Sequence, residues 1–352
     1  MQTTTTPTRY PEVSVQGSPR ELGRQIGEAT RQQTRGFCEV ALQRVHKTMK
    51  VSRERAIAIA HQSMNFAEQY RPDLIEELQG TAEGANVSID DLMLLQVRNQ
   101  LTPDDDAACT SLSLQPDAGR CIVAQTWDND PVLDEFTVVL TRRPEGKPAT
   151  MVCTQAGLIT YMGLSETGIG ACVNTLPAPS RPVGVPHYFI LREIYEAHSV
   201  NEAVESVSRA HRAIPANIML ATPQGPANLE VTLDSVHLLT PMAKEPLAHT
   251  NHCLHPDLVA INDKFPELID SQPRKERIDR LLATTQGTVE ELQAILSDHD
   301  RFPTSICRHS NDDPIYGFWQ TVFALIIEPS ERRMFISRGT PCSAPFEEYL
   351  LN

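Results

Sequence analysis

Residues 104–130 read DDDAACTSLSLQPDAGRCIVAQTWDND and divide the chain into two parts with different patterns. Upstream, apolar residues recur at the spacing of amphipathic helices. Downstream, short runs rich in β-branched residues are separated by turn residues, as in CIVAQTW at 121–127. Helices followed by many strands predict an α+β sandwich rather than alternating βαβ units.

The expected elements follow from capping signals and periodicity. Ser18-Pro19-Arg20-Glu21 has the features of a capping box with proline in the first turn, and it predicts a helix that continues to Val45. Three further helices are expected before Pro103, beginning near Ser52, Asp73 and Ser88. The later part of the chain predicts helices at 186–198, 201–209, 274–283 and 288–297, and a last hairpin from TVFALIIEP (321–329) and RRMFISR (332–338).

Composition excludes several classes of protein. A length of 352 residues allows one large domain or two ordinary ones. The net charge of −14 argues against nucleic acid or an anionic membrane surface as the main partner, because both require a basic face. The N-terminus lacks the apolar core of a signal peptide and no run has the length of a membrane span, so a cytoplasmic protein is expected.

The eight cysteines are dispersed over the chain, and without a secretory signal they predict free thiols rather than a disulfide framework. Four of the cysteines are expected to be small apolar fillers; these are Cys38, Cys121, Cys153 and Cys342.

Cys109 stands where the acidic stretch meets the first strand. If the bond between Ala108 and Cys109 is cut, one residue carries both a thiol and a free α-amine. The α-amine titrates near ~7.7–8.0, so it can accept the thiol proton at physiological pH. The residues alone leave a second interpretation, in which Cys109 is a buried structural cysteine at the start of a strand.

Several segments match a known family in the right order. They are GSPRELGRQIG (17–27), CTSLSLQPDAGRCIVAQTWDND (109–130), GLSETGIGACVNTL (163–176), HTNHCL (249–254) and FPTSICR (302–308). Together they resemble the acyl-coenzyme A:6-aminopenicillanate acyltransferase family, a cysteine peptidase family of N-terminal-nucleophile (Ntn) hydrolases. The resemblance implies an αββα fold, with two antiparallel sheets between helical layers, and self-cleavage between Ala108 and Cys109.

The resemblance also implies roles for single residues. Cys109 corresponds to the nucleophile, and Asp128 to the acid that holds the N-terminal amine. Asn251 corresponds to the donor that stabilises the oxyanion, Arg308 to the arginine beside the nucleophile, and Asn174 to a further active-site asparagine. Three residues are expected to contact the substrate: Thr110, Ser111 and Trp127. From the residues alone, Asp128 is also compatible with a turn, Asn251 with a loop cap and Arg308 with a surface salt bridge.

Two positions depart from the family pattern. Ala108 stands where the family often has glycine, and Gln125 stands where the bile-salt hydrolase branch tends to have an arginine, which argues against bile acids as substrates. A separate motif, HxxHxxH at His249, His252 and His255, invites a zinc interpretation, but Pro256 favours a strand entering a loop over the helix that this spacing requires. No metal and no cofactor are therefore expected.

The sequence thus predicts a cofactor-independent enzyme made of a helical segment, 1–108, and a chain 109–352 that stay associated as one domain. Its expected reaction is hydrolysis of a non-peptide or amino-acyl amide through a thioester on Cys109. The alternatives are acyl transfer from acyl-coenzyme A or an amide donor to an amine, and an uncleaved, inactive binding protein. The expected partner is a small-molecule amide or acyl-coenzyme A, without nucleic acid or membrane, and a homo-oligomer is compatible with the sequence.

Overall fold

A computed structural model describes residues 8–47, 51–101, 108–241, 245–265, 270–314 and 317–352, and within these ranges it contains two β-sheets. The eight-stranded sheet has the spatial order β1 (Glu12–Gly17), β4 (Thr137–Pro144), β5 (Thr150–Gln155), β6 (Met162–Ser165), β7 (Gly170–Asn174), β8 (Ala216–Thr222), β9 (Gly225–Val231), β10 (Val236–Leu239). The six-stranded sheet has the order β11 (Leu247–His249), β2 (Ala108–Asp117), β3 (Arg120–Asn129), β12 (Gln320–Glu328), β13 (Arg333–Arg338), β14 (Phe346–Leu350).

Strand β3 shows why the two sheets stack. Its side chains alternate between two cores, as the period of two in a strand requires. Val123 and Trp127 belong to the large core shared with the eight-stranded sheet. Ile122 and Ala124 belong to a second core on the opposite face of the six-stranded sheet. Both faces of this sheet are therefore buried, and the strand is apolar along most of its length.

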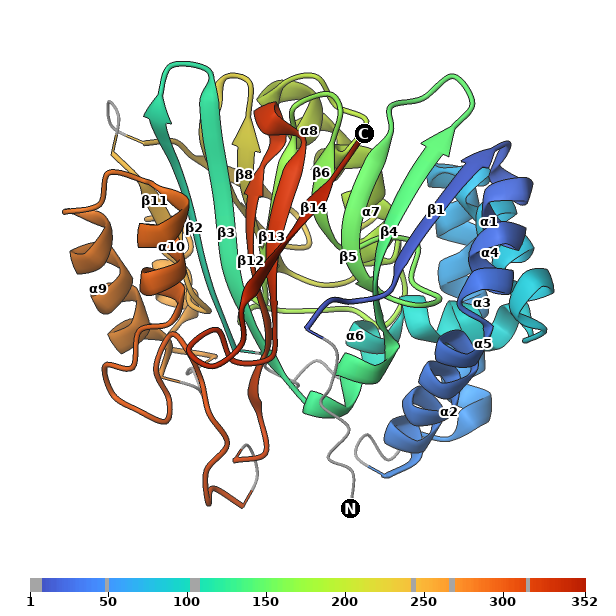
Figure 1. Cartoon of the computed structure of the whole chain (residues 1–352). Helices are drawn as coiled ribbons and strands as arrows, with labels where there is room; N and C mark the ends of the chain where they lie inside the picture. The colour runs from blue at the N-terminus through green and yellow to red at the C-terminus, as the bar shows by residue number, and fades with distance from the viewer. Residues whose placement is uncertain (1–7, 48–50, 102–107, 242–244, 266–269, 315–316) are drawn as a thin grey trace, which may run out of the picture.

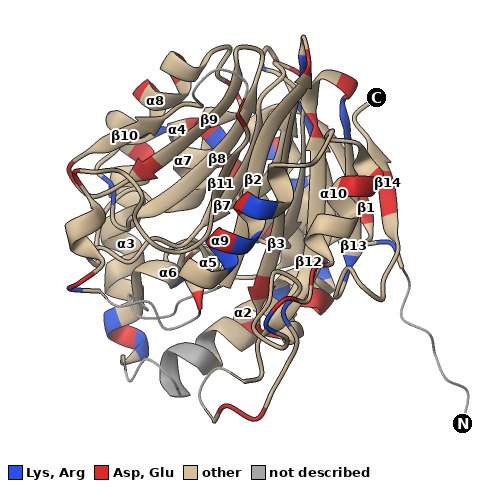
Figure 2. Ribbon diagram, turned by 90° about the vertical axis from the view of Figure 1, so that its left-hand side faces the viewer, with Lys and Arg blue, Asp and Glu red and all other residues tan. Residues whose placement is uncertain are grey.

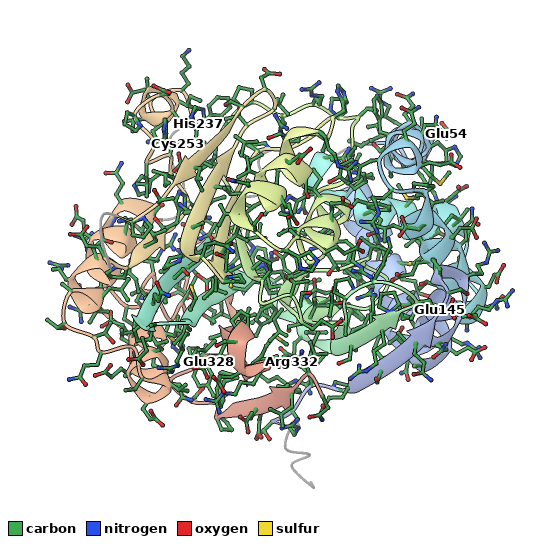
Figure 3. The ribbon with its side chains drawn as sticks, turned by 90° about the horizontal axis from the view of Figure 1, so that it is seen from above. Glu54, Glu145, His237, Cys253, Glu328 and Arg332 are labelled. Atoms are coloured by element: carbon green, nitrogen blue, oxygen red, sulfur yellow. The ribbon has the colours of Figure 1, made fainter. Side chains whose placement is uncertain are left out.

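Helices cover the outer faces of both sheets (Figure 1). Against the eight-stranded sheet lie α1 (Pro19–Ala29), α2 (Arg31–Lys47), α3 (Arg53–Tyr70), α4 (Pro72–Ala85), α5 (Ile89–Gln96), α6 (Arg98–Leu101), α7 (His187–Ile194) and α8 (Val200–Ser208). Against the six-stranded sheet lie α9 (Ser271–Leu282) and α10 (Val289–Leu296). The view from above shows the same separation, with the first helices and α9–α10 at opposite ends of the molecule (Figure 3). The predicted αββα sandwich is confirmed.

The motif at residues 17–27 is explained by the packing of α1 on α4. Ser18 and Glu21 form the predicted capping box at the start of α1. A Cβ atom on Gly23 would lie 1.9 Å from the carbonyl oxygen of Glu77 in α4, and one on Gly80 would lie 2.3 Å from that of Arg20. The backbones of the two helices thus approach so closely that only glycine fits at these positions.

The expected helices of the later part are confirmed as α7 to α10, and the last hairpin as β12 and β13. Three expectations need correction. The helix predicted from Pro19 to Val45 is two helices separated at Thr30. Residues 1–108 are not wholly helical, because Glu12–Gly17 forms β1. The eight-stranded sheet is not wholly antiparallel, because β1 pairs with β4 in parallel. Within the described residues, none of the helices has both the length and the apolar character needed to span a bilayer.

Candidate active site

Cys109 is the second residue of β2 and is only 1% exposed. It pairs in register with Trp127 of β3, and its side chain belongs to the core between the two sheets. Burial, and then the nearby Asp128 carboxylate, raise the pKa of the Cys109 thiol far above its ordinary value; the positive charge of Arg274 opposes this shift. In the uncut chain the thiol therefore stays protonated, and it needs a base before it can act as a nucleophile.

The main chain of Cys109 is held by side chains from two distant segments. Its N–H donates to Oδ1 of Asn251 at 3.0 Å, and its carbonyl oxygen accepts from Nη1 of Arg274 at 2.6 Å. Arg274 also donates through Nη2 to the same Oδ1 atom at 2.9 Å. All three residues are buried, so the main chain of Cys109 is held on both sides in a closed network.

The strand register explains why Asn251 reaches this position. The ladder between β11 and β2 ends where His249 pairs with Ser111. If this antiparallel ladder continued by two residues, Asn251 would be the partner of Cys109. Its side-chain oxygen accepts the hydrogen bond that a backbone carbonyl would otherwise accept. Helix α9, which lies over β2 and β11 with its basic residues drawn blue in Figure 2, supplies Arg274 from the same side.

Asn251 is itself fixed from both ends. Its backbone N–H donates to Oγ of Ser271 at 2.7 Å, and its Nδ2 donates to the carbonyl oxygen and to Oγ1 of Thr175 at 3.2 and 2.9 Å. Buried Glu230 closes the turn that follows, because it accepts from Nε2 of His249 at 2.8 Å and from the backbone N–H groups of Leu254 and His255. In the uncut chain the amide nitrogen of Asn251 is thus directed at Thr175, and its oxygen is directed at Cys109.

Asp128 lies directly opposite Ala108 in the β2–β3 ladder and is fully buried. Its Oδ1 accepts from Oγ1 of Thr321 at 2.7 Å, and its Oδ2 lies 3.7 Å from Nε of Arg308. Burial raises the pKa of Asp128 to about 6, and the charges of Arg308 and Arg274 oppose that shift. A carboxyl group that titrates near neutrality thus lies beside the residue that precedes Cys109.

The two arginines of the site have different contacts. The guanidinium of Arg308 lies against Asp128, and its backbone is joined to Thr321, so its expected role beside the nucleophile stays a prediction. The arginine that contacts Cys109 is Arg274, which the sequence showed only as the first residue of a charged helix. No spacing or motif marks Arg274, because its position depends on how α9 lies over β2.

The remaining predicted residues lie in the same region, and each has different contacts. Asn174 ends β7, and its Nδ2 donates to the carbonyl oxygen of His249 at 3.4 Å. Trp127 stacks on Phe323 with ring centroids 4.9 Å apart. Thr110 is fully buried and accepts from Nη1 of Arg274 at 2.8 Å, on the face of β2 opposite to Cys109.

Ser111 is also fully buried, and its Oγ donates to the carbonyl oxygen of His249 at 3.4 Å. Gln125, the departure from the bile-salt hydrolase pattern, donates to the carbonyl oxygen of Val173 at 2.7 Å. A hydrogen bond from its side chain lowers the pKa of the Cys109 thiol, against the larger effect of burial. The expected substrate contacts of Thr110, Ser111 and Trp127 remain predictions, since each side chain is buried in the uncut chain.

The HxxHxxH motif does not converge on one point. His249 contacts Glu230, whereas Nδ1 of His252 contacts Oγ of Ser271 at 2.7 Å. His255 stacks near His237, with ring centroids 4.2 Å apart, toward the edge of the molecule where Figure 3 labels His237. The imidazole rings of the three histidines therefore have separate partners.

The raised pKa of Asp128 predicts that the contribution of this carboxyl group to the stability of the uncut protein falls as the pH rises from about 4 to about 7. The folded chain keeps this proton up to a pH near 6, whereas an unfolded aspartate releases it near the ordinary value of 3.8. Between these values the folded state binds more protons, so the free energy of unfolding falls with rising pH. The loss from pH 4 to pH 7.5 is expected to be about 2 kcal/mol.

Urea unfolding of Cys109→Ala and of Cys109→Ala/Asp128→Asn at these two pH values measures the effect. Relative to the second protein, the first should lose about 2 kcal/mol of unfolding free energy between these pH values, because the lowered pKa values of His187 and His252 act in both proteins alike. Equal pH dependence in the two proteins would contradict the assigned titration.

Comparisons with known proteins agree on one family. A family model described as acyl-coenzyme A:6-aminopenicillanic acid acyl-transferase matches residues 114–342, which include Asp128, Asn251 and Arg308. The 40 kDa form of acyl-coenzyme A:6-aminopenicillanic-acid-acyltransferase from Emericella nidulans is 27% identical over 344 residues, covering 96% of this chain and 95% of the relative.

Two solved structures are also similar. Penicillin V acylase from Agrobacterium tumefaciens has a TM-score of 0.46 at 13% identity, covering 65% of this chain and 83% of that chain. A mutant of conjugated bile acid hydrolase from Clostridium perfringens has a TM-score of 0.44 at 11% identity, covering 69% of this chain and 97% of that chain.

Proposed function

The chain belongs to the acyl-coenzyme A:6-aminopenicillanic acid acyl-transferase family, and we propose that it is a self-processing enzyme that cleaves amide bonds through a thioester on Cys109. The family membership confirms the resemblance found in the sequence motifs. The substrate class is a small non-peptide or amino-acyl amide, and no cofactor takes part in the proposed chemistry.

One observation carries the proposal. The peptide group between Ala108 and Cys109 is buried between Asn251, which accepts from its N–H, and Asp128, which lies opposite Ala108. A merely structural cysteine in a strand needs neither an asparagine side chain in place of a ladder partner nor a buried carboxylate beside the preceding residue. The same two residues would contact the α-amine that cleavage of this bond creates.

The cut requires only groups of this chain and water. The Cys109 sulfur attacks the carbonyl carbon of Ala108 and gives up its thiol proton, and the bond from that carbon to the nitrogen of Cys109 breaks as the nitrogen takes up this proton. The resulting thioester between Ala108 and the sulfur is then hydrolysed. Water supplies the new carboxyl group of Ala108, and the thiol of Cys109 is regenerated.

After the cut, the α-amine of Cys109 is the base for turnover of the substrate. A neutral amine accepts the thiol proton as the sulfur attacks the substrate carbonyl, and Asp128 holds the resulting ammonium. Asn251 supplies an amide donor for the tetrahedral oxyanion. Arg308 keeps Asp128 in place by its charge, and Arg274 fixes the main chain of Cys109. Asn174 positions the strand end that carries Asn251, through the carbonyl of His249.

The thioester has two outcomes. Water releases a free acid, whereas an amine that binds next to the thioester receives the acyl group. Hydrolysis is the first choice because water is always present and transfer needs a shaped acceptor site. Transfer is the second candidate, because the relative from Emericella nidulans is an acyltransferase for which acyl-coenzyme A is named as the donor.

Mass measurement tests the proposal at its first step. The purified protein is expected to yield two chains, 1–108 and 109–352, the second beginning CTSLSL. A single species of 39.1 kDa after prolonged incubation would instead support an uncleaved binding protein. The processed protein is then assayed with a panel of N-acyl amides and amino-acid amides, with and without added amines, and product analysis separates acid from transferred amide.

The cytoplasmic location expected from the sequence is kept as part of this proposal. All eight cysteines are free in the structure, a state that a reducing compartment favours.

A further inference from the structure

Outside the Cys109 site, one cluster brings together four side chains with the chemistry of a metal centre. We propose that this cluster is a zinc site of the Cys₂His₂ type, formed by His299, Cys307, His309 and Cys342. The HxxHxxH motif that the sequence offered as a zinc site plays no part in it. The inference does not depend on the proposed reaction, and its test does not use activity.

The distances fit tetrahedral coordination. Nε2 of His309 lies 3.2 Å from Nε2 of His299, 3.5 Å from Sγ of Cys307 and 3.4 Å from Sγ of Cys342. All four ligand atoms lie within 4.8 Å of one another. With zinc bonds of about 2.0–2.1 Å to nitrogen and about 2.3 Å to sulfur, a tetrahedron has edges of about 3.4 Å between nitrogens and about 3.6 Å between nitrogen and sulfur. Small side-chain shifts therefore suffice to accept the ion.

Backbone hydrogen bonds hold three of the four ligands in place. Cys307 is fixed by its N–H, which donates to the carbonyl oxygen of Asp298 at 3.1 Å, and His309 by its N–H, which donates to that of Pro303 at 2.9 Å. Cys342 lies in a turn closed by the N–H of Ser343, which donates to the carbonyl oxygen of Thr340 at 3.0 Å. Because these turns already hold the ligands, little conformational entropy is lost when the metal binds.

The donor set selects the metal class. Two thiolates and two neutral imidazoles are the ligands that zinc takes in structural sites, and hard cations such as Mg²⁺ and Ca²⁺ prefer oxygen. Two thiolates also neutralise the two charges of the ion, so the complex is electrically balanced. The sequence-based expectation for Cys342 as an apolar filler is wrong, because its side chain is exposed and lies beside His309.

The zinc site is connected to the Cys109 region through Arg308. Arg308 lies between two of the ligands in the chain, and its backbone is joined to Thr321, which donates to Asp128. Zinc would join the segment 298–309 to the turn at Cys342 and so fix the backbone that carries Arg308. The ion would thus have a structural role near Asp128, the acid of the proposed mechanism, and would not touch the reacting atoms.

Metal content tests the site directly. The full-length protein, in whichever processed state it is purified, is reduced, incubated with zinc, desalted and analysed for metal and protein. About one zinc ion per chain is expected for the wild type, and less than about a tenth of that for Cys342→Ser and for His299→Ala. Both replaced side chains are exposed, so these variants are expected to fold; circular dichroism checks this.

A matched control comes from the second histidine group of the described chain, made of His237, His255 and Asp257. His255→Ala should keep its zinc, because this group offers no thiolate. Cobalt in place of zinc should give thiolate-to-cobalt charge-transfer bands in the wild type that Cys342→Ser lacks. Zinc should also raise the Tm of the wild type and leave that of Cys342→Ser unchanged.

Three results would overturn the proposal. One is a wild type that stays free of zinc after reduction and loading. Another is a Cys342→Ser protein that retains the full zinc content. The third is peptide mapping that finds a Cys307–Cys342 disulfide in a protein that still binds no zinc once this bond is reduced.

Discussion

Cys109→Ala is expected to remain one chain of 352 residues and to have no measurable amide cleavage. Alanine removes the sulfur that attacks the amide carbonyl in the proposed mechanism, both in the cut at Ala108 and in turnover of the substrate. A residue acting alone as nucleophile cannot be replaced by its neighbours, so rates should fall by at least about 10⁴-fold. Intact-mass measurement follows the cut, and the amide panel follows turnover.

The control for this variant is a second buried cysteine on the neighbouring strand. Cys121 lies on β3, the strand next to β2, and contacts Ser113 rather than the groups around Cys109. Cys121→Ala loses a small buried group and should still be processed and active. If the Cys109→Ala chain is cut at Ala108, or if both alanine variants lose activity to the same extent, Cys109 is not the nucleophile.

The sequence predicted those parts of the fold that local pattern encodes. The capping box at Ser18 was predicted because it depends on four consecutive residues. Cys109 and Asp128 were assigned through the family resemblance, and the structure shows that they lie in consecutive strands joined by a short turn. Asn251, 142 residues after Cys109, was assigned only through the family motif HTNHCL, since no local rule brings β11 to the edge of β2.

Features that depend on tertiary packing were missed. Arg274 lies on a helix whose sequence is typical of an exposed, charged surface, and its burial follows from the seating of α9 on β2. β1 was missed because it is a short run with only two apolar residues, Val13 and Val15, and because its partner β4 lies far away in the chain. The zinc ligands are separated by 8, 2 and 33 residues, which matches no simple spacing, and only the fold brings Cys342 to His309. The direction of the Asn251 amide likewise depends on Thr175, which follows a strand of the other sheet.

Asn251→Ala is expected to lower kcat/KM of the processed enzyme by about 10²–10³, mainly through kcat. A side-chain amide that donates to the oxyanion stabilises the transition state more than the bound substrate, and the loss of one such donor has this magnitude. In the uncut chain Asn251 instead accepts from the N–H of Cys109, so processing should slow as well. Kinetics are therefore measured only on material shown by intact mass to be fully cut.

Asn251→Asp separates the two roles of this side chain. A carboxylate still accepts from Arg274 and from the main chain of Cys109, so the free energy of unfolding should stay closer to that of the wild type than in Asn251→Ala. It has no N–H to donate and would place negative charge beside the oxyanion, so its kcat should fall as far as that of the alanine variant. Thr175→Val, which removes only one acceptor of the Asn251 amide, is the matched control and should lower kcat by less than about tenfold. An aspartate variant within about tenfold of the wild type would mean that Asn251 acts by anchoring Cys109 and not by stabilising the oxyanion.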